Sequence, residues 1–145
     1  MRTTILAGLA LVLLAGCGGD DGGGSGGEKT QLAGPLTYER GGGIAGRRDR
    51  LVVQPDGTAK LTVRDKTSEI ELEPADLDRL AAEVERADLA SVPSRSTSPK
   101  PIPDAFGYRI EYGSSVITTD QAALPKEIRT LVARLGQLVD RYEKP

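Results

Sequence analysis

The sequence of 145 residues contains no histidine and no tryptophan, and it has a single cysteine, Cys17. Histidine is the usual base in Ser-His-Asp and Cys-His nucleophile systems, and histidine and cysteine are the main ligands of zinc. These absences exclude both kinds of site. Carboxylate catalysis or a hard-cation site would need its usual acidic pattern, and neither pattern occurs. We therefore expect no catalytic residues, no metal and no cofactor.

Charge is balanced and dispersed along the chain. The sequence has 19 Lys and Arg residues against 21 Asp and Glu residues, which gives a net charge of −2 at pH 7. Binding of nucleic acid needs a clustered basic face. The densest basic stretch runs from Arg47 to Arg50, and because no aromatic residues are interleaved with it, we interpret it as a solvated strand edge. A nucleic-acid partner is not expected.

The N-terminal region has a short apolar stretch over residues 5–15. It ends in Leu14-Ala15-Gly16-Cys17, which resembles the lipobox of a bacterial lipoprotein signal. A generic secretory signal and a membrane helix are the alternatives. A spanning helix needs about 20 apolar residues, however, and an ordinary signal would leave no lone thiol at the cleavage site.

The sequence predicts three parts. Residues 1–16 would be a lipoprotein signal peptide, and Cys17 would be the lipid-attachment residue that holds the protein on the extracytoplasmic face of the cell membrane. Residues 17–33 would form a flexible tether, because a glycine-rich polar sequence buries too little apolar surface to fold. Residues 34–145 suit one small domain with a single core.

Alternation of apolar and polar residues predicts six strands in this domain. Pro55-Asp56-Gly57 is a turn signal between two of them, and residues 65–66 form a second tight turn. The pattern indicates a four-stranded antiparallel meander followed later by a hairpin. The predicted strands cover residues 36–40, 48–54, 58–64, 67–72 and 105–112, and a partner strand with Val116 and Thr118.

Helical spacing of apolar residues predicts two helices. The first begins at Pro74, a residue that suits the first helical position, and continues to about Ala87. The second runs from about Pro125 to Tyr142. Residues 93–103 contain four prolines and are expected to form an extended loop. The expected fold class is α+β, with both helices packed on one face of an antiparallel sheet.

A glycine-rich segment between the first two predicted strands carries the G-x-G-x-x-G pattern: Gly41, Gly42, Gly43, Ile44, Ala45 and Gly46. Dinucleotide binding requires a helix directly after such a loop, whereas residues 47–54 are predicted to be a strand. Two interpretations stay open. The segment is either a connection with positive-φ positions or a bulge, or a protein-binding loop that another backbone approaches closely, with Ile44 at its tip.

Three other groups of residues have both a structural and a functional interpretation. Phe106, Tyr108 and Tyr112 fit half-buried sheet residues better than a stacking platform. The proline-rich residues 93–103 fit a rigid connection somewhat better than a docking element. The acidic candidates fit solvated faces and helix-dipole partners: Glu69, Glu71, Glu73, Asp76 and Asp78.

The domain resembles the emfourin family, whose members are protein inhibitors of thermolysin-like metalloproteases. The resemblance covers nearly all of residues 35–140. It is carried by residues 36–46, residues 51–53 with the Pro-Asp-Gly turn at 55–57, LEPADLDRLAAEVERADL at 72–89, DAFGYRIEY at 104–112 and ITTDQAALPKEIRTLVARL at 117–135.

The resemblance implies binding without chemistry. The domain would occlude the active-site cleft of a secreted thermolysin-like zinc metalloprotease, and Ile44, flanked by glycines, would enter that cleft as a wedge. The lipobox and tether place the target at the cell envelope, so the expected partners are the membrane, through lipid on Cys17, and such a protease. The alternative is an envelope interaction or structural lipoprotein without inhibitory activity. An enzyme ranks third, because the catalytic residue types are missing.

Overall fold

The computed structural model describes residues 31–100 and 102–143. Cys17, the predicted signal peptide and residues 17–30 of the predicted tether lie outside the described residues. No helix in the described part of the chain is long and apolar enough to cross a membrane.

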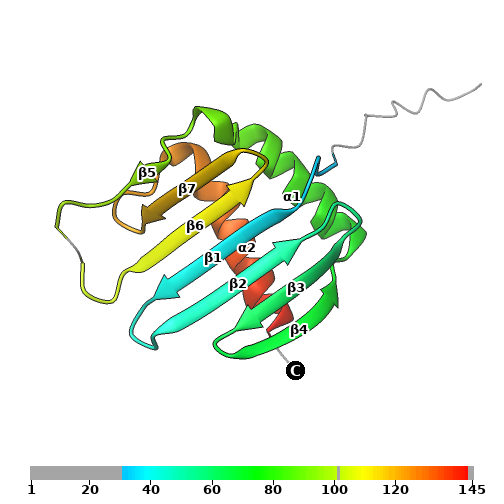
Figure 1. Ribbon diagram of the computed structural model, residues 1–145, viewed down its shortest axis with the longest axis horizontal. Helices are drawn as coiled ribbons and strands as arrows, with labels where there is room; N and C mark the ends of the chain where they lie inside the picture. Colours follow the sequence, from blue (N-terminus) through cyan, green and yellow to red (C-terminus); the bar gives the residue numbers. More distant parts are fainter. Residues whose placement is uncertain (1–30, 101, 144–145) are drawn as a thin grey trace, which may run out of the picture.

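The fold is α+β, as the sequence predicts: seven strands form one sheet in the order β4-β3-β2-β1-β6-β7-β5, and two helices lie on one of its faces (Figure 1). The strands are β1 (Leu36–Gly42), β2 (Arg47–Val53), β3 (Thr58–Val63), β4 (Lys66–Glu71), β5 (Arg95–Ser96), β6 (Phe106–Tyr112) and β7 (Ser115–Asp120). The helices are α1 (Pro74–Ala87) and α2 (Arg129–Tyr142), and two short 3-10 turns are η1 (Leu89–Ser91) and η2 (Lys126–Ile128).

Strand β1 lies at the centre of the sheet, because it pairs with β2 on one side and with β6 on the other, both antiparallel. The predicted meander is therefore strands β1 to β4, and the later hairpin, β6 and β7, joins it at β1. At the start of β1, Leu36 pairs with Val53 and Tyr112. Towards its end, Gly41 pairs with Arg48 and Gly107.

The far edge of the sheet differs in detail from the expectation. Residues 93–103 are not wholly a loop, since β5 pairs in parallel with β7 over two residues. The short strand lies at the sheet edge, where proline-rich sequence is tolerated. Strand β7 is the predicted partner strand, but its buried residues are Ile117 and Thr119, whereas Val116 is exposed.

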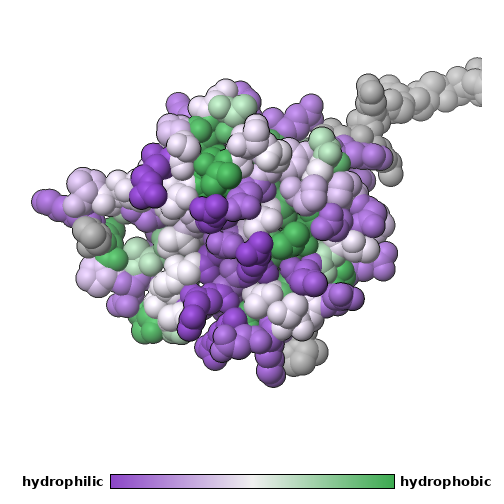
Figure 2. All heavy atoms as spheres, in the orientation of Figure 1, coloured by the Kyte–Doolittle hydropathy of each residue, from purple (hydrophilic) through white to green (hydrophobic). Residues whose placement is uncertain are grey.

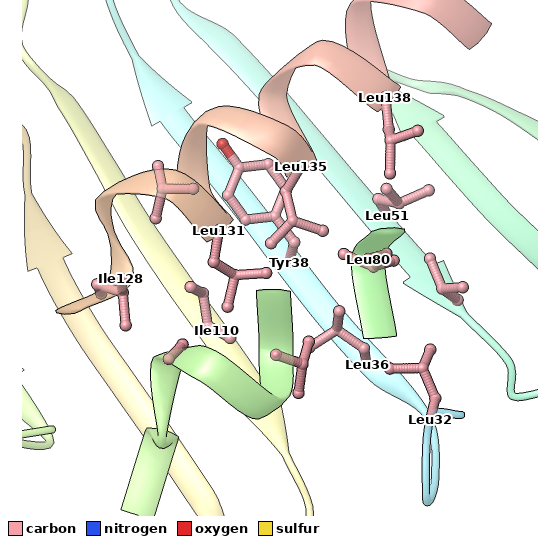
Figure 3. Close-up of a cluster of buried hydrophobic side chains, with 14 of the residues drawn as sticks. Leu32, Leu36, Tyr38, Leu51, Leu80, Ile110, Ile128, Leu131, Leu135 and Leu138 are labelled. Carbon is pink, nitrogen blue, oxygen red and sulfur yellow. The ribbon is translucent and has the colours of Figure 1, made fainter. Parts of the chain in front are cut away.

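The hydrophobic core lies between the helices and the inner face of the sheet. Figure 3 shows Leu131 and Leu135 of α2 beside Tyr38 and Ile110 of the central strands. The second predicted helix begins later than expected, with η2 before α2, and its regularly spaced apolar residues are buried from Ile128 to Val139, while Tyr142 is partly buried.

The folded domain begins earlier than the sequence predicts. Leu32 lies within the predicted tether, yet it is 4% exposed and belongs to the core. The amide of Ala33 donates a hydrogen bond to the hydroxyl of Tyr112 at 2.7 Å. The core of the described residues runs from Leu32 to Val139, so residues 31–145 are expected to fold as one domain.

Helix α1 has the predicted start, with Glu73 at the N-cap and Pro74 at the first helical position. One prediction about its first turn was wrong. Asp76 is not solvated but 2% exposed, and its carboxylate accepts a hydrogen bond from Arg141 of α2. Besides complementing the helix dipole, Asp76 therefore joins the two helices at the edge of the core.

Candidate protein-binding hairpin

The glycine-rich segment connects β1 to β2 at one end of the sheet (Figure 1). Strand β1 ends at Gly42, and residues 43–46 form a turn, which we call the tip turn. The amide of Gly46 donates a hydrogen bond to the carbonyl oxygen of Gly43 at 2.9 Å, which closes a β-turn. Strand β2 follows directly, so the segment lacks the helix N-terminus that binds phosphates in dinucleotide sites.

Three glycines of the segment are required by the backbone. Gly42, Gly43 and Gly46 have φ angles of 103°, 74° and 56°, a region that favours glycine. A Cβ atom on Gly42 would lie 2.5 Å from the carbonyl oxygen of Ala105, and one on Gly43 would lie 2.7 Å from the ring of Phe106. The expectation of positive-φ positions is confirmed, and the tip turn is packed closely against the start of β6.

The side chain of Ile44 is 92% exposed, more than that of any other large hydrophobic residue in the described part of the chain. Single exposed aliphatic residues are common on protein surfaces and need no functional explanation by themselves. The surroundings of Ile44 are more informative, because the backbone that carries it is held in place by several independent contacts.

A network of ion pairs fixes the base of the hairpin to the C-terminal end of α2. The carboxylate of Asp49 is fully buried and accepts hydrogen bonds from Nε of Arg40 at 2.8 Å and Nε of Arg47 at 2.9 Å. Arg40 also donates to Asp140 of α2 at 2.8 Å, and Arg47 donates to Glu143, just beyond the helix, at 2.6 Å. The hairpin is therefore clamped to a helix about a hundred residues away in sequence.

Arg40 links this network to the tip turn. Burial opposes the charge of Arg40, but its hydrogen bonds to Asp140 and Asp49 raise its pKa above the ordinary value. Its guanidinium carbon lies 5.6 Å from the ring centroid of Phe106, within the range of a cation–π interaction. Because Gly43 packs on the same ring, one aromatic side chain supports the turn and is itself supported by the network.

The prediction that residues 47–50 form a solvated strand edge was wrong. Strand β2 lies inside the sheet, between β1 and β3. Successive residues of a strand point to opposite faces, so Arg47 and Asp49 face the helices while Arg48 and Arg50 lie on the open face. In Figure 2 the open face is largely hydrophilic, with separated hydrophobic patches.

The other sequence candidates have mainly structural positions. Phe106, Tyr108 and Tyr112 are half-buried in β6, as predicted, and Tyr108 stacks on Tyr38 with ring centroids 6.3 Å apart. Pro101 of the proline-rich segment lies outside the described residues. Among the described residues, no three His, Cys, Asp or Glu side chains gather in an arrangement that could hold a metal ion.

The sequence interpretation missed the buried carboxylate, although a signal for it was present. Asp49, Leu51 and Val53 share one face of the predicted strand, and two of the three are apolar core candidates. An acid in such a series is expected to be paired with a basic residue. The partner Arg40, however, lies on a different strand, and the pairing register could not be read from the sequence.

No protein-family model matches the chain, and no curated protein matches it either.

Proposed function

We propose that the protein is a membrane-anchored extracytoplasmic lipoprotein, held by lipid on Cys17, whose single domain binds proteins without catalysis and inhibits a thermolysin-like zinc metalloprotease. The observation that carries the proposal is Ile44, 92% exposed at the end of a hairpin fixed by buried ion pairs. A loop that is already ordered in its binding conformation loses little entropy when it docks. This is the property that an inhibitory wedge needs.

The position of the hairpin supports the same function. The predicted tether leads into Leu32 and then into β1, which starts at Leu36, whereas the tip turn follows the end of the same strand. Seven residues of extended chain span roughly 20 Å, at about 3.4 Å per residue. Ile44 is thus presented at the end of the domain opposite the anchor, where a secreted or envelope protein can reach it.

The test is inhibition of peptide cleavage. Residues 31–145 are mixed at micromolar concentration with several purified thermolysin-like zinc metalloproteases. Inhibition by the unaltered domain, weakened about tenfold to a hundredfold by Ile44→Asp, supports the proposal, because burial of an aliphatic side chain contributes about 1.5–3 kcal/mol. The matched control is Val116→Asp, which places the same charge at another exposed aliphatic position, on β7.

Two results would overturn the proposal in different ways. No inhibition of any of these enzymes would remove the inhibitory function and leave an envelope interaction or structural lipoprotein. Inhibition that is unchanged by Ile44→Asp would place the inhibitory surface away from the tip turn. Both variants are checked by circular dichroism and thermal unfolding, so that loss of folding is not taken for loss of binding.

A further inference from the structure

Two glycines lie side by side in the middle of strand pairing, next to the hairpin. Gly41 of β1 pairs directly with Gly107 of β6 on the open face of the sheet. With no side chains there, the surface is hollowed to a volume of about 470 Å³. We call this depression the glycine hollow.

The backbone does not require glycine at either position, in contrast to the three glycines beside the tip turn. Neither Gly41 nor Gly107 has a positive φ angle. A Cβ atom would lie 3.8 Å from its nearest neighbour on Gly41 and 3.9 Å on Gly107, which is ordinary van der Waals contact. Glycine weakens a strand, and where no bulge or steric conflict explains it, a close approach by another molecule is a common reason.

The rim of the hollow is rich in arginine. Its lining includes Arg48, Arg50, Arg64 and Arg109, and Glu39 is the one lining acid that lies on the open face. Within the described part of the chain, Arg50 pairs with Glu39 at 3.1 Å and Arg109 with Glu111 at 2.6 Å, whereas Arg48 and Arg64 have no ion-pair partner.

Asp120 is the acid on the far side of the hollow, where it pairs across the strands with Gly107. Its carboxylate accepts hydrogen bonds from the backbone amides of Ser98, Ala122 and Ala123 at 2.6–2.9 Å. These bonds, led by the one from Ser98, lower the pKa of Asp120, so its carboxylate stays charged, with its oxygens engaged by the segment after β5 and the loop after β7. Asp120 lies on the β6 and β7 side of the hollow, and the unpaired Arg48 and Arg64 lie on the β2 and β3 side, where the positive charge is therefore concentrated.

The backbone of Arg64 is a second observation that points to a role for the rim arginines. It occupies the first position of the two-residue turn between β3 and β4 with a φ of 55°, where glycine is the favoured residue. An L-residue with a side chain is strained in this conformation. A large cationic residue at such a position is easier to explain if its guanidinium binds an anionic group at the rim of the hollow.

We propose that the glycine hollow receives an acidic side chain of the same protein that receives Ile44. The inference rests on the proposed function, because it requires the hairpin to be a protein-binding site. It specifies the partner further: an apolar pocket for Ile44 with carboxylates beside it. The opposite end of the open face carries Glu69, Glu71 and Glu111 with Lys60 among them, so its net charge is negative and would orient an acidic partner towards the hairpin end.

An anionic lipid surface is the competing occupant, and the geometry disfavours it. The hollow lies at the hairpin end of β1, whereas the predicted anchor joins at the other end of that strand. A protein partner is favoured for a second reason. A recess lined by arginines suits a carboxylate side chain, whereas attraction to a charged bilayer needs no recess.

Two kinds of variant test the hollow without removing a structural contact. Gly107→Val fills it with a side chain that strands favour, so the unfolding midpoint should stay or rise while binding falls. Arg48→Glu and Arg64→Glu reverse the rim charge. Each should lower the association rate of the protease about tenfold at roughly 50 mM salt, with a smaller effect at roughly 0.5 M salt. Lys60→Glu, a charge reversal elsewhere on the open face, should change it much less.

A probe that is independent of inhibition separates this inference from the proposed function. Hexaglutamate is titrated into the ¹⁵N-labelled domain (residues 31–145), and saturable shifts of the Gly41 and Gly107 amides are expected, reduced in Arg48→Glu. No such shifts, together with unchanged protease association in the arginine variants, would overturn the inference even if Ile44→Asp abolishes inhibition. Binding to phosphatidylglycerol vesicles that Gly107→Val abolishes, without any response to hexaglutamate, would also overturn it in favour of lipid.

Discussion

Replacement of Asp49 by Asn tests whether the hairpin is held by its ion pairs. The Asp49 carboxylate is fully buried and accepts hydrogen bonds from two arginines, so the variant leaves Arg40 and Arg47 without their shared counter-charge. Removal of one partner from a buried ion pair costs about 3–5 kcal/mol. Both arginines keep a second acid, Asp140 or Glu143, on the more exposed side. We therefore expect the lower end, a loss of about 3 kcal/mol of unfolding free energy.

The assay is urea unfolding of residues 31–145, with amide hydrogen exchange as a local measurement. The control is Glu39→Gln, which breaks a cross-strand pair with Arg50 on the open face; both side chains are at least 36% exposed, so the expected loss is under about 0.5 kcal/mol. Faster exchange at the Gly46 amide in Asp49→Asn would show that the tip turn has loosened. A loss as small as the control's would refute the idea that the buried network fixes the hairpin.

Three further variants test other parts of the fold. Tyr38→Phe should raise the unfolding free energy by about 1 kcal/mol, because the buried Tyr38 hydroxyl has no hydrogen-bond partner among the described residues. Burial also raises the pKa of Tyr38, so above about pH 10 the tyrosine ionises in the unfolded state before it does in the folded state, and the unfolding free energy falls as the pH rises. Unfolding free energies measured across this pH range should fall less steeply in Tyr38→Phe than in the unaltered protein. Gly57→Ala should cost about 1–2 kcal/mol in thermal unfolding, since φ is 91° and the new Cβ would lie 3.3 Å from Leu77. Arg141→Gln leaves buried Asp76 without its ion-pair partner and should cost about 1–2 kcal/mol in urea unfolding. Arg86→Gln removes a side chain that is 68% exposed from its pair with Glu83 and should cost less than about 0.5 kcal/mol.

The elements of this fold could be predicted because their signals are local. Helix α1 begins at Pro74 and ends at Ala87, as expected, because the proline and the apolar spacing are both visible over one short window. The order and pairing of the strands could not be predicted in the same way. That β6 pairs with β1 depends on the core closing around Tyr38 and Ile110, which are 72 residues apart in sequence.

The tip turn was likewise visible in the sequence, while its support was not. Clustered glycines next to a predicted strand indicate a turn, and Ile44 was the one bulky residue in it. The contact of Gly43 with Phe106, and of Arg40 with the same ring, joins segments more than 60 residues apart in sequence. Such contacts follow from strand register, which a single sequence without a partner strand does not specify.

The glycines near the hairpin differ from one another in the structure but not in the sequence. In the sequence, Gly41 and Gly43 look alike, but only Gly43 has a positive φ angle and a ring against its backbone. Gly41 could carry a Cβ atom without conflict, and strand propensity alone would favour a β-branched residue there and at Gly107. Their presence is therefore better explained by what approaches the surface than by what lies beneath it. If this reasoning holds, filling the hollow strengthens the fold and weakens the complex, a pair of opposite effects that a purely structural role for these glycines does not produce.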